Sequence, residues 1–273
     1  MEFRTPVVIP PAPFSIEPLE PLLFVGSCFA DSIGHRFQEE RFPVTINPYG
    51  VMYNPASILH TVEQYFSPDT AHPSPLTPHV AFFTLGTNHV YRLKETGQIV
   101  DNCQKRPHNL FQEEQLTIEQ CTDYLVRAVD ILLQRNPSVK VIVTVSPIRY
   151  AKYGFHGSQL SKATLLLASE ALVTQRSCVT YFPAYEIVLD ELRDYRFYQP
   201  DMLHPSQQAV EYIWQLFVEA FFSARAKSFL REWQPIKHAL AHRPFNPDSD
   251  EYKNFLAKAR QDEAILMARY ANQ

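Results

Sequence analysis

A helical pattern followed by an almost continuous apolar run is the feature that most limits how this chain can fold. Residues 118–136, "IEQCTDYLVRAVDILLQRN", place apolar side chains three and four positions apart, which predicts an amphipathic helix. The next segment, "VKVIVTVSP", is apolar and β-branched at nearly every position, as expected of a strand that is covered on both faces. Strands of this kind belong to parallel sheets with helices on both sides, so the pair predicts an α/β fold.

The same alternation recurs along the chain. Strands are predicted in 22–26, 42–46, 80–87, 89–93, 97–100 and 179–182, and helices in 29–40, from Asn54 to near Ser67, in 158–175, 184–195, 207–230 and 247–271. Asn54 before Pro55 is an expected helix N-cap, and Thr117 with Gln120 an expected capping box. We therefore expect a three-layer α/β/α sandwich with a central, mostly parallel sheet in residues 1–230, which begin with a Pro-rich lead-in. A C-terminal helical extension follows in 231–273.

The charge and composition exclude several classes of protein. The 25 basic and 29 acidic residues give a net charge of −4 without any long block of one sign, which argues against nucleic acid or an anionic membrane as partner. No apolar run approaches the roughly 18 residues of a membrane helix, and prolines interrupt the N-terminal segment where a signal peptide would be apolar, so we expect a cytoplasmic protein. The four cysteines are widely spaced and form no C-x-x-C pair, so neither a zinc site nor a disulfide framework is expected. No cofactor is expected either. The terminal helix is expected either to pad the domain or to pair with a second copy in a homo-oligomer.

Ser27 occupies the position that most favours an enzymatic function. It follows the apolar strand "LLFVG" and precedes a helix, and ligands of parallel α/β folds bind beyond the carboxyl ends of the strands. A serine nucleophile needs a histidine base and usually an acid that orients it. Two Asp-x-x-His pairs could supply both, Asp69 with His72 and Asp201 with His204. The first lies in a Pro-rich segment with the pattern of a surface loop.

The second pair is the stronger candidate because Pro200 and Pro205 stiffen its loop, which follows the last strand and helix of the α/β pattern. An acyl-transfer site also needs donors for an oxyanion. The Ser27 and Gly50 N–H groups and the Asn88 amide are candidates, because each follows a predicted strand.

Several motifs together resemble one family. These are "VGSCFAD" at 25–31, "INPYGVMYNP" at 46–55, "TLGTNHVYR" at 84–92, "TVSPIRY" at 144–150, "QLSKATLLLA" at 159–168 and "DELRDYRFYQPDMLHPS" at 190–206. In this order they closely resemble the GSCFA-domain proteins, which are similar in turn to the SGNH, or GDSL-like, esterases. The resemblance spans about residues 20–225. It implies the α/β/α sandwich, a Ser27 nucleophile with Asp201 and His204, no metal, and an oxyanion hole of Ser27, Gly50 and Asn88.

The chain also departs from the superfamily pattern. The nucleophile is usually preceded by Asp, where this chain has Gly26, and Asn102 competes with Asn88 for the amide role. The leading hypothesis is a serine esterase acting on a small-molecule or glycan ester, such as an acetylated carbohydrate, with Arg149 either binding an anionic part of the substrate or forming a structural ion pair. The alternatives are a non-catalytic carbohydrate- or peptide-binding module on the same fold and a thiol enzyme that uses Cys28. We expect Cys28 instead to pack into the core.

Overall fold

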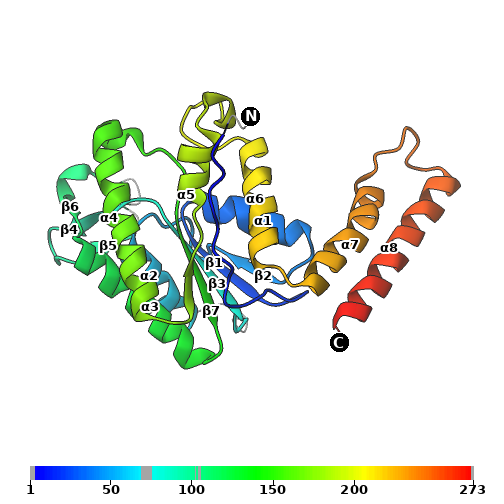
Figure 1. Cartoon of the computed structure of the whole chain (residues 1–273), viewed down its shortest axis with the longest axis horizontal. Helices are drawn as coiled ribbons and strands as arrows, with labels where there is room; N and C mark the ends of the chain where they lie inside the picture. The colour runs from blue at the N-terminus through cyan, green and yellow to red at the C-terminus, as the bar shows by residue number, and fades with distance from the viewer. Residues whose placement is uncertain (1–3, 69–75, 102, 104–105, 272–273) are drawn as a thin grey trace.

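The computed structural model describes residues 4–68, 76–101, 103 and 106–271. Its centre is a five-stranded sheet in the order β2-β1-β3-β7-β8 (Figure 1). The strands are β1 (Leu22–Gly26), β2 (Val44–Ile46), β3 (Val80–Leu85), β7 (Lys140–Val145) and β8 (Val179–Tyr181). All four pairings between them are parallel, which confirms the predicted fold class.

Helices cover both faces of this sheet. The covering helices are α1 (Cys28–Glu39), α2 (Pro55–Tyr65), α3 (Ile118–Arg135), α4 (Gly154–Gln175), the short α5 (Ala184–Glu186) and α6 (Gln207–Phe221), and α7 (Ala224–Ala241) and α8 (Asp250–Ala271) follow them. Both predicted start signals are confirmed. Asn54 caps α2 by accepting from the Ser57 N–H, and Thr117 forms the capping box of α3 with Gln120.

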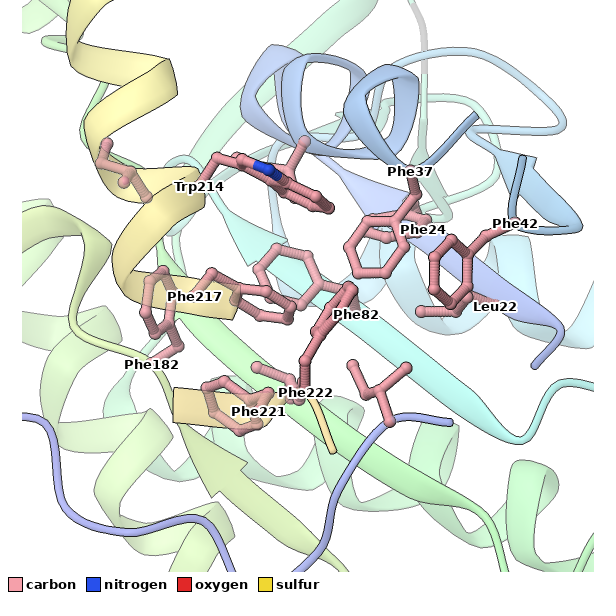
Figure 2. Packing of buried hydrophobic residues seen from close by; sticks show 14 of the residues in the cluster. Leu22, Phe24, Phe37, Phe42, Phe82, Phe182, Trp214, Phe217, Phe221 and Phe222 are labelled. Carbon is pink, nitrogen blue, oxygen red and sulfur yellow. The ribbon is translucent and has the colours of Figure 1, made fainter. Parts of the chain in front are cut away.

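Successive residues of one strand enter opposite layers of the core. Leu22 and Phe24 of β1 pack with α1, α6 and α7, whereas Leu23 and Val25 pack with α2, α3 and α4. This alternation follows from the two-residue period of a strand, and it explains why β1 is apolar throughout. Figure 2 shows the first layer, where the Phe37 ring of α1 lies 5.3 Å from that of Phe24 and 4.9 Å from that of Trp214 on α6.

A small antiparallel sheet in the order β5-β4-β6 lies beside the central one. It contains β4 (His89–Leu93), β5 (Ile99–Val100) and β6 (Phe111–Gln115). The sequence predicted the first two strands and missed β6. The reason is that only Phe111 of "FQEEQ" is buried, so the strand lacks the apolar pattern of a core element.

Two helix predictions are wrong in extent. The expected helix over 207–230 is interrupted at Phe222 and Ser223, because Ser223 has extended backbone angles and caps a new helix by accepting from the Ala226 N–H. Residues 184–195 form α5 and then a π-helical segment, Ile187–Leu192, which Arg193 ends in the left-handed region at φ 45°.

The C-terminal helices α7 and α8 form a hairpin that extends from one side of the sandwich (Figure 1). α7 crosses residue 230, where the sequence suggested a boundary. Trp233 of α7 is buried and donates to the Glu39 carbonyl at 3.0 Å, and Tyr270 of α8 packs on Phe229. The hairpin therefore shares part of its core with the sandwich. None of the helices in the described parts of the chain has the length and apolar character needed to cross a membrane.

The strand order places β1 at the point where the chain changes direction across the sheet. The path from β1 through α1 leads to β2 on one side, and the path through α2 returns to β3 on the other. Loops leaving the carboxyl end of such a strand diverge to opposite faces and leave a crevice between them. Ser27 follows β1 directly, so it lies at this crevice.

Candidate active site

Ser27 joins β1 to α1 and caps the helix. Its backbone is extended, and its Oγ accepts a hydrogen bond from the Phe29 N–H at 3.2 Å. The Thr84 hydroxyl lies 3.0 Å from the same oxygen. The side chain is almost completely buried, so several contacts fix the position of its hydroxyl.

The structure explains why Gly26 precedes this serine. Gly26 has φ +144°, and a Cβ at this position would lie 2.2 Å from the carbonyl oxygen of Thr84. Any larger residue, including the Asp that the superfamily resemblance implies, would collide with β3. The Gly26 N–H donates instead to Asn47 Oδ1 at 2.8 Å, and Asn47 donates from Nδ2 to Asp31 of α1. Asn47 and Asp31 therefore brace the turn here.

His204 is held by Asp201 in the loop before α6. Asp201 Oδ2 lies 2.6 Å from His204 Nδ1, and Oδ1 accepts from the N–H groups of Leu203 and His204 at 2.9 and 3.0 Å. These two backbone donors, together with the imidazole, lower the pKa of the Asp201 carboxyl to about 2. Because Nδ1 is bound to a carboxylate, the favoured neutral tautomer of His204 carries its proton on Nδ1 and leaves Nε2 as the basic atom.

Ser27 and His204 line the same cavity. It has a volume of about 250 Å³ and is bounded by Ser27, Cys28, Tyr53, Gly86, Ser146, Ile148, Arg149, Tyr150, Ala151, Lys152, Leu203 and His204. These residues come from the segments that follow the carboxyl ends of β1, β2, β3 and β7 and from the loop before α6. The fold thus brings the predicted nucleophile and the predicted base, which are far apart in the sequence, to one cavity.

Cys28 also lines this cavity, so the expectation that it packs into the core is wrong. It is the first residue of α1, and its Sγ lies 3.8 Å from the hydroxyl of Tyr53. Burial, together with Cys28, raises the pKa of Tyr53 to about 12, so the phenol keeps its proton. The side chain of Cys28 is more exposed than that of Ser27.

The oxyanion donors that the sequence analysis predicted do not converge on the cavity. The Ser27 N–H donates to Thr84 Oγ1 at 2.8 Å, because β1 pairs with β3 in a register that places Gly26 opposite Thr84. Asn88 donates its side-chain amide to the Leu116 carbonyl, and the Gly50 N–H donates to Asn47 in a turn. Asn102, the alternative amide, lies outside the described residues, as do Asp69 and His72.

A buried lysine that the sequence analysis did not select supports one side of the cavity. Lys162 of α4 is 2% exposed, and its Nζ donates to the carbonyls of Gly86 and Ser146, both at 2.8 Å. Burial lowers its pKa to about 7. Ser161, the preceding residue, accepts from the Asn88 N–H at 2.9 Å. Ser161 and Lys162 therefore connect the segments that follow β3 and β7.

Arg149 connects the cavity to the His204 loop. Its N–H donates to the Leu203 carbonyl at 3.0 Å, and its guanidinium donates to the Met202 carbonyl at 3.0 Å. Within the described residues it forms no ion pair with a carboxylate. No group of three or more potential metal ligands is found among His, Cys, Asp and Glu in the same part of the chain.

A comparison with protein-family models decides the family. The model described as "GSCFA family" matches residues 21–80 and 72–217. The chain belongs to the GSCFA family. A second model, "GSCFA domain protein, C-terminal domain", matches residues 233–272, and the described part of this range, 233–271, lies in the hairpin of α7 and α8.

Solved structures similar to this GSCFA protein include two carbohydrate-active enzymes. A catalytic mutant of an acetylxylan esterase from Geobacillus stearothermophilus is 12% identical, with 77% of this chain and 98% of that chain covered and a TM-score of 0.48. A family 3 carbohydrate esterase from Clostridium thermocellum is also 12% identical, with coverage of 78% and 97% and a TM-score of 0.43. A search of curated proteins gave no match to this sequence.

Proposed function

We propose that this GSCFA protein is a serine esterase in which Ser27 is the nucleophile and His204 the general base. The observation that carries the proposal is that both residues line one cavity while Asp201 holds Nδ1 of the imidazole. An imidazole held in this way has Nε2 free to accept a proton, which is the role that a serine nucleophile requires.

The contacts of Ser27 fit this role. A hydroxyl group has two acceptor lone pairs and one proton. In the proposed arrangement the Phe29 N–H and the Thr84 hydroxyl both donate to Ser27 Oγ, so the proton of Ser27 is left for the base. Thr84 can act as this donor because its own oxygen accepts from the Ser27 N–H.

The reaction proceeds in two halves. Nε2 of His204 takes the Ser27 proton as Oγ bonds to the ester carbonyl carbon. The tetrahedral intermediate then collapses: the bond to the alcohol oxygen breaks, and that oxygen takes the proton from His204. Water, deprotonated by His204, attacks the acyl-enzyme, and the acid leaves as the proton returns to Ser27.

Two groups beside Ser27 are the proposed oxyanion donors. The first N–H groups of a helix lack partners within the helix, and those of Phe29 and Ala30 are bound by Ser27. This leaves the Cys28 N–H, which has no acceptor among the described residues. The Tyr53 hydroxyl is the second donor, because it lines the cavity and stays protonated. A cavity of about 250 Å³ lies below the roughly 300 Å³ at which sites for drug-sized ligands begin, which supports a small acyl group such as acetyl.

A thiol enzyme is the second candidate, because Cys28 lines the same cavity and is the more exposed of the two possible nucleophiles. Covalent labelling separates the two functions. The protein is treated with a fluorophosphonate, and the modified peptide is identified by mass spectrometry in the wild type, Ser27→Ala and Cys28→Ala.

The esterase proposal predicts a label on Ser27 that persists in Cys28→Ala and disappears in Ser27→Ala, and a fourth sample, His204→Ala, should also remain unlabelled. A label on Cys28, with activity that survives Ser27→Ala, supports the thiol enzyme instead. No label and no turnover in the folded wild type contradicts both candidates and supports a non-catalytic binding module.

A further inference from the structure

A second chamber adjoins the cavity and has no role in the chemistry described so far. It has a volume of about 240 Å³ and shares Ile148 and Arg149 with the cavity that contains Ser27. Each chamber is smaller than the roughly 300 Å³ of a typical ligand site, so each fits a fragment of a larger molecule. An ester has two such fragments, the acyl group and the alcohol.

Aromatic rings form much of the wall of this second chamber. Phe155, Tyr185, Tyr195 and Tyr198 all line it, and Phe155 and Tyr195 are largely exposed. Exposed rings beside a cavity offer flat faces for a ring-shaped ligand. Gln159 and the tyrosine hydroxyls add polar groups that can bind the hydroxyls of such a ring.

The charge of the chamber is positive. Arg149 and Arg193 line it, and neither forms an ion pair with a carboxylate among the described residues. The Arg149 guanidinium instead lies 4.1 Å from the centre of the Phe155 ring. Stacking holds this cation in place without neutralising it, so its charge is available to a ligand.

Nearby acidic residues do not cancel this charge. Asp194 is the only carboxylate among the described lining residues, and it accepts from the N–H and the guanidinium of Arg196 at 2.8 and 2.9 Å. Glu186 and Asp190 follow Tyr185 in the sequence but do not line the chamber. Glu186 accepts from the Tyr181 hydroxyl at 2.9 Å.

We propose that this chamber binds the alcohol side of the ester, and that this alcohol is a hydroxylated ring with an acidic group, such as a uronic acid. The identification of this ligand as the alcohol part of an ester rests on the proposed esterase function. The affinity for an acidic ring follows from the exposed aromatic faces and the two guanidinium groups alone. Arg149 borders both chambers and would contact the ligand where its two fragments meet.

A binding experiment tests this inference without relying on turnover. The full chain is titrated by calorimetry with methyl glucuronide and with methyl glucoside, which differ in the carboxylate. A guanidinium–carboxylate contact in a partly open site corresponds to about a tenfold preference for the glucuronide. Arg193→Met should reduce that preference to about threefold or less, and Tyr195→Ala should weaken the binding of both sugars. The matched control, Arg243→Met, changes an exposed arginine that does not line the chamber and should bind as the wild type does.

Equal binding of the two sugars, or a preference that survives both Arg193→Met and Arg149→Met, would overturn the inference. Hydrolysis of p-nitrophenyl acetate by the same samples separates it from the proposed function. Turnover without a preference for the glucuronide refutes only the acidic-ring site and leaves the esterase proposal in place. A preference that depends on Arg193, in a protein without turnover, refutes the esterase and keeps the binding site.

Discussion

The hydroxyl of Thr84 on β3 lies 3.0 Å from the hydroxyl of Ser27, at the end of the neighbouring strand β1. Thr84 also accepts from the Ser27 N–H, so a single side chain fixes both the backbone and the hydroxyl of the proposed nucleophile. The parallel register that pairs Gly26 with Thr84 creates this relationship. It makes the orientation of Ser27 depend on the central sheet and not only on its own turn.

Thr84→Val should therefore lower kcat by about 10- to 100-fold, because valine keeps the shape of threonine but cannot donate to Ser27. The variant loses both side-chain hydrogen bonds to Ser27, although the Ser27 N–H keeps the Thr84 carbonyl as acceptor, so the loss in stability should be about 1 to 2 kcal/mol. Thr144→Val is the matched control, since Thr144 is equally buried and pairs with Thr84 on β7, but its hydroxyl does not contact Ser27. Steady-state kinetics and urea unfolding should show similar stability losses for the two variants and a fall in kcat for Thr84→Val alone.

Gly26→Ala should be far more disruptive than Gly50→Ala. Both glycines have positive φ, at +144° and +95°, but only the Cβ at position 26 meets another atom, at 2.2 Å from Thr84 O. Gly50→Ala should cost about 1 kcal/mol from backbone strain alone, whereas Gly26→Ala must displace β1 or β3 and should cost more than about 3 kcal/mol. Thermal unfolding measures both, and equal melting temperatures would refute the steric explanation of Gly26.

Asp201→Asn should lower kcat by roughly a thousandfold with little change in KM. Asparagine can still accept from the Leu203 and His204 N–H groups, but its NH₂ group would face His204 Nδ1 and favour the tautomer with the proton on Nε2. An Asp201→Asn variant with at least a tenth of the wild-type kcat would rule out this role.

The ionised Asp201 should also stabilise its loop. Its folded pKa of about 2 lies below the ordinary value, so this contribution is complete above about pH 4 and is lost as the pH falls toward 2. The pH dependence of unfolding over this range should be weaker in Asp201→Asn than in the wild type.

Lys162 should make the stability of the wild type increase as the pH rises. Its folded pKa of about 7 lies below the value of about 10.4 in an unfolded chain, so between these values the unfolded state binds more protons. The cost of burying the charge is full below pH 7 and disappears toward pH 10. Lys162→Met removes this dependence but leaves the Gly86 and Ser146 carbonyls without their donor.

Unfolding experiments at several values between pH 6 and 9.5 check this prediction. The free energy of unfolding of the wild type minus that of Lys162→Met should grow with pH. A difference that stays constant over the range would show that Lys162 does not titrate within it.

The sequence predicted the fold where burial dictates residue type. β1, β3 and β7 are covered on both faces, so nearly all of their residues are apolar and the strands are easily recognised. The sequence analysis missed β6 because its side chains are mostly exposed. It missed the break before α7 because the apolar pattern continues on both sides of Ser223. β6 is defined by its backbone pairing with β4 and the break by the Ser223 cap, and both leave a weak signal in a single sequence.

The candidate site could be predicted where one short segment contains the proposed chemistry. Ser27 is marked by the strand and helix around it, and Asp201 and His204 by their spacing. Thr84 and Lys162 act through contacts with other strands, which depend on a register that the sequence does not reveal. The one available signal for Lys162 was a charged residue in the otherwise small and apolar segment "SKATLLLA". For the same reason, the positions of Gly50 and Asn88 after predicted strands did not show that their donors are bound elsewhere.

The most direct test of the central claim is the rate of p-nitrophenyl acetate hydrolysis by the wild type, Ser27→Ala, Cys28→Ala and His204→Ala, with folding checked by circular dichroism. We predict turnover by the wild type and Cys28→Ala, and no rate above the uncatalysed reaction for folded Ser27→Ala and His204→Ala. Turnover by Ser27→Ala at the wild-type rate would contradict the account, because the hydroxyl beside Thr84 would then be only a helix cap.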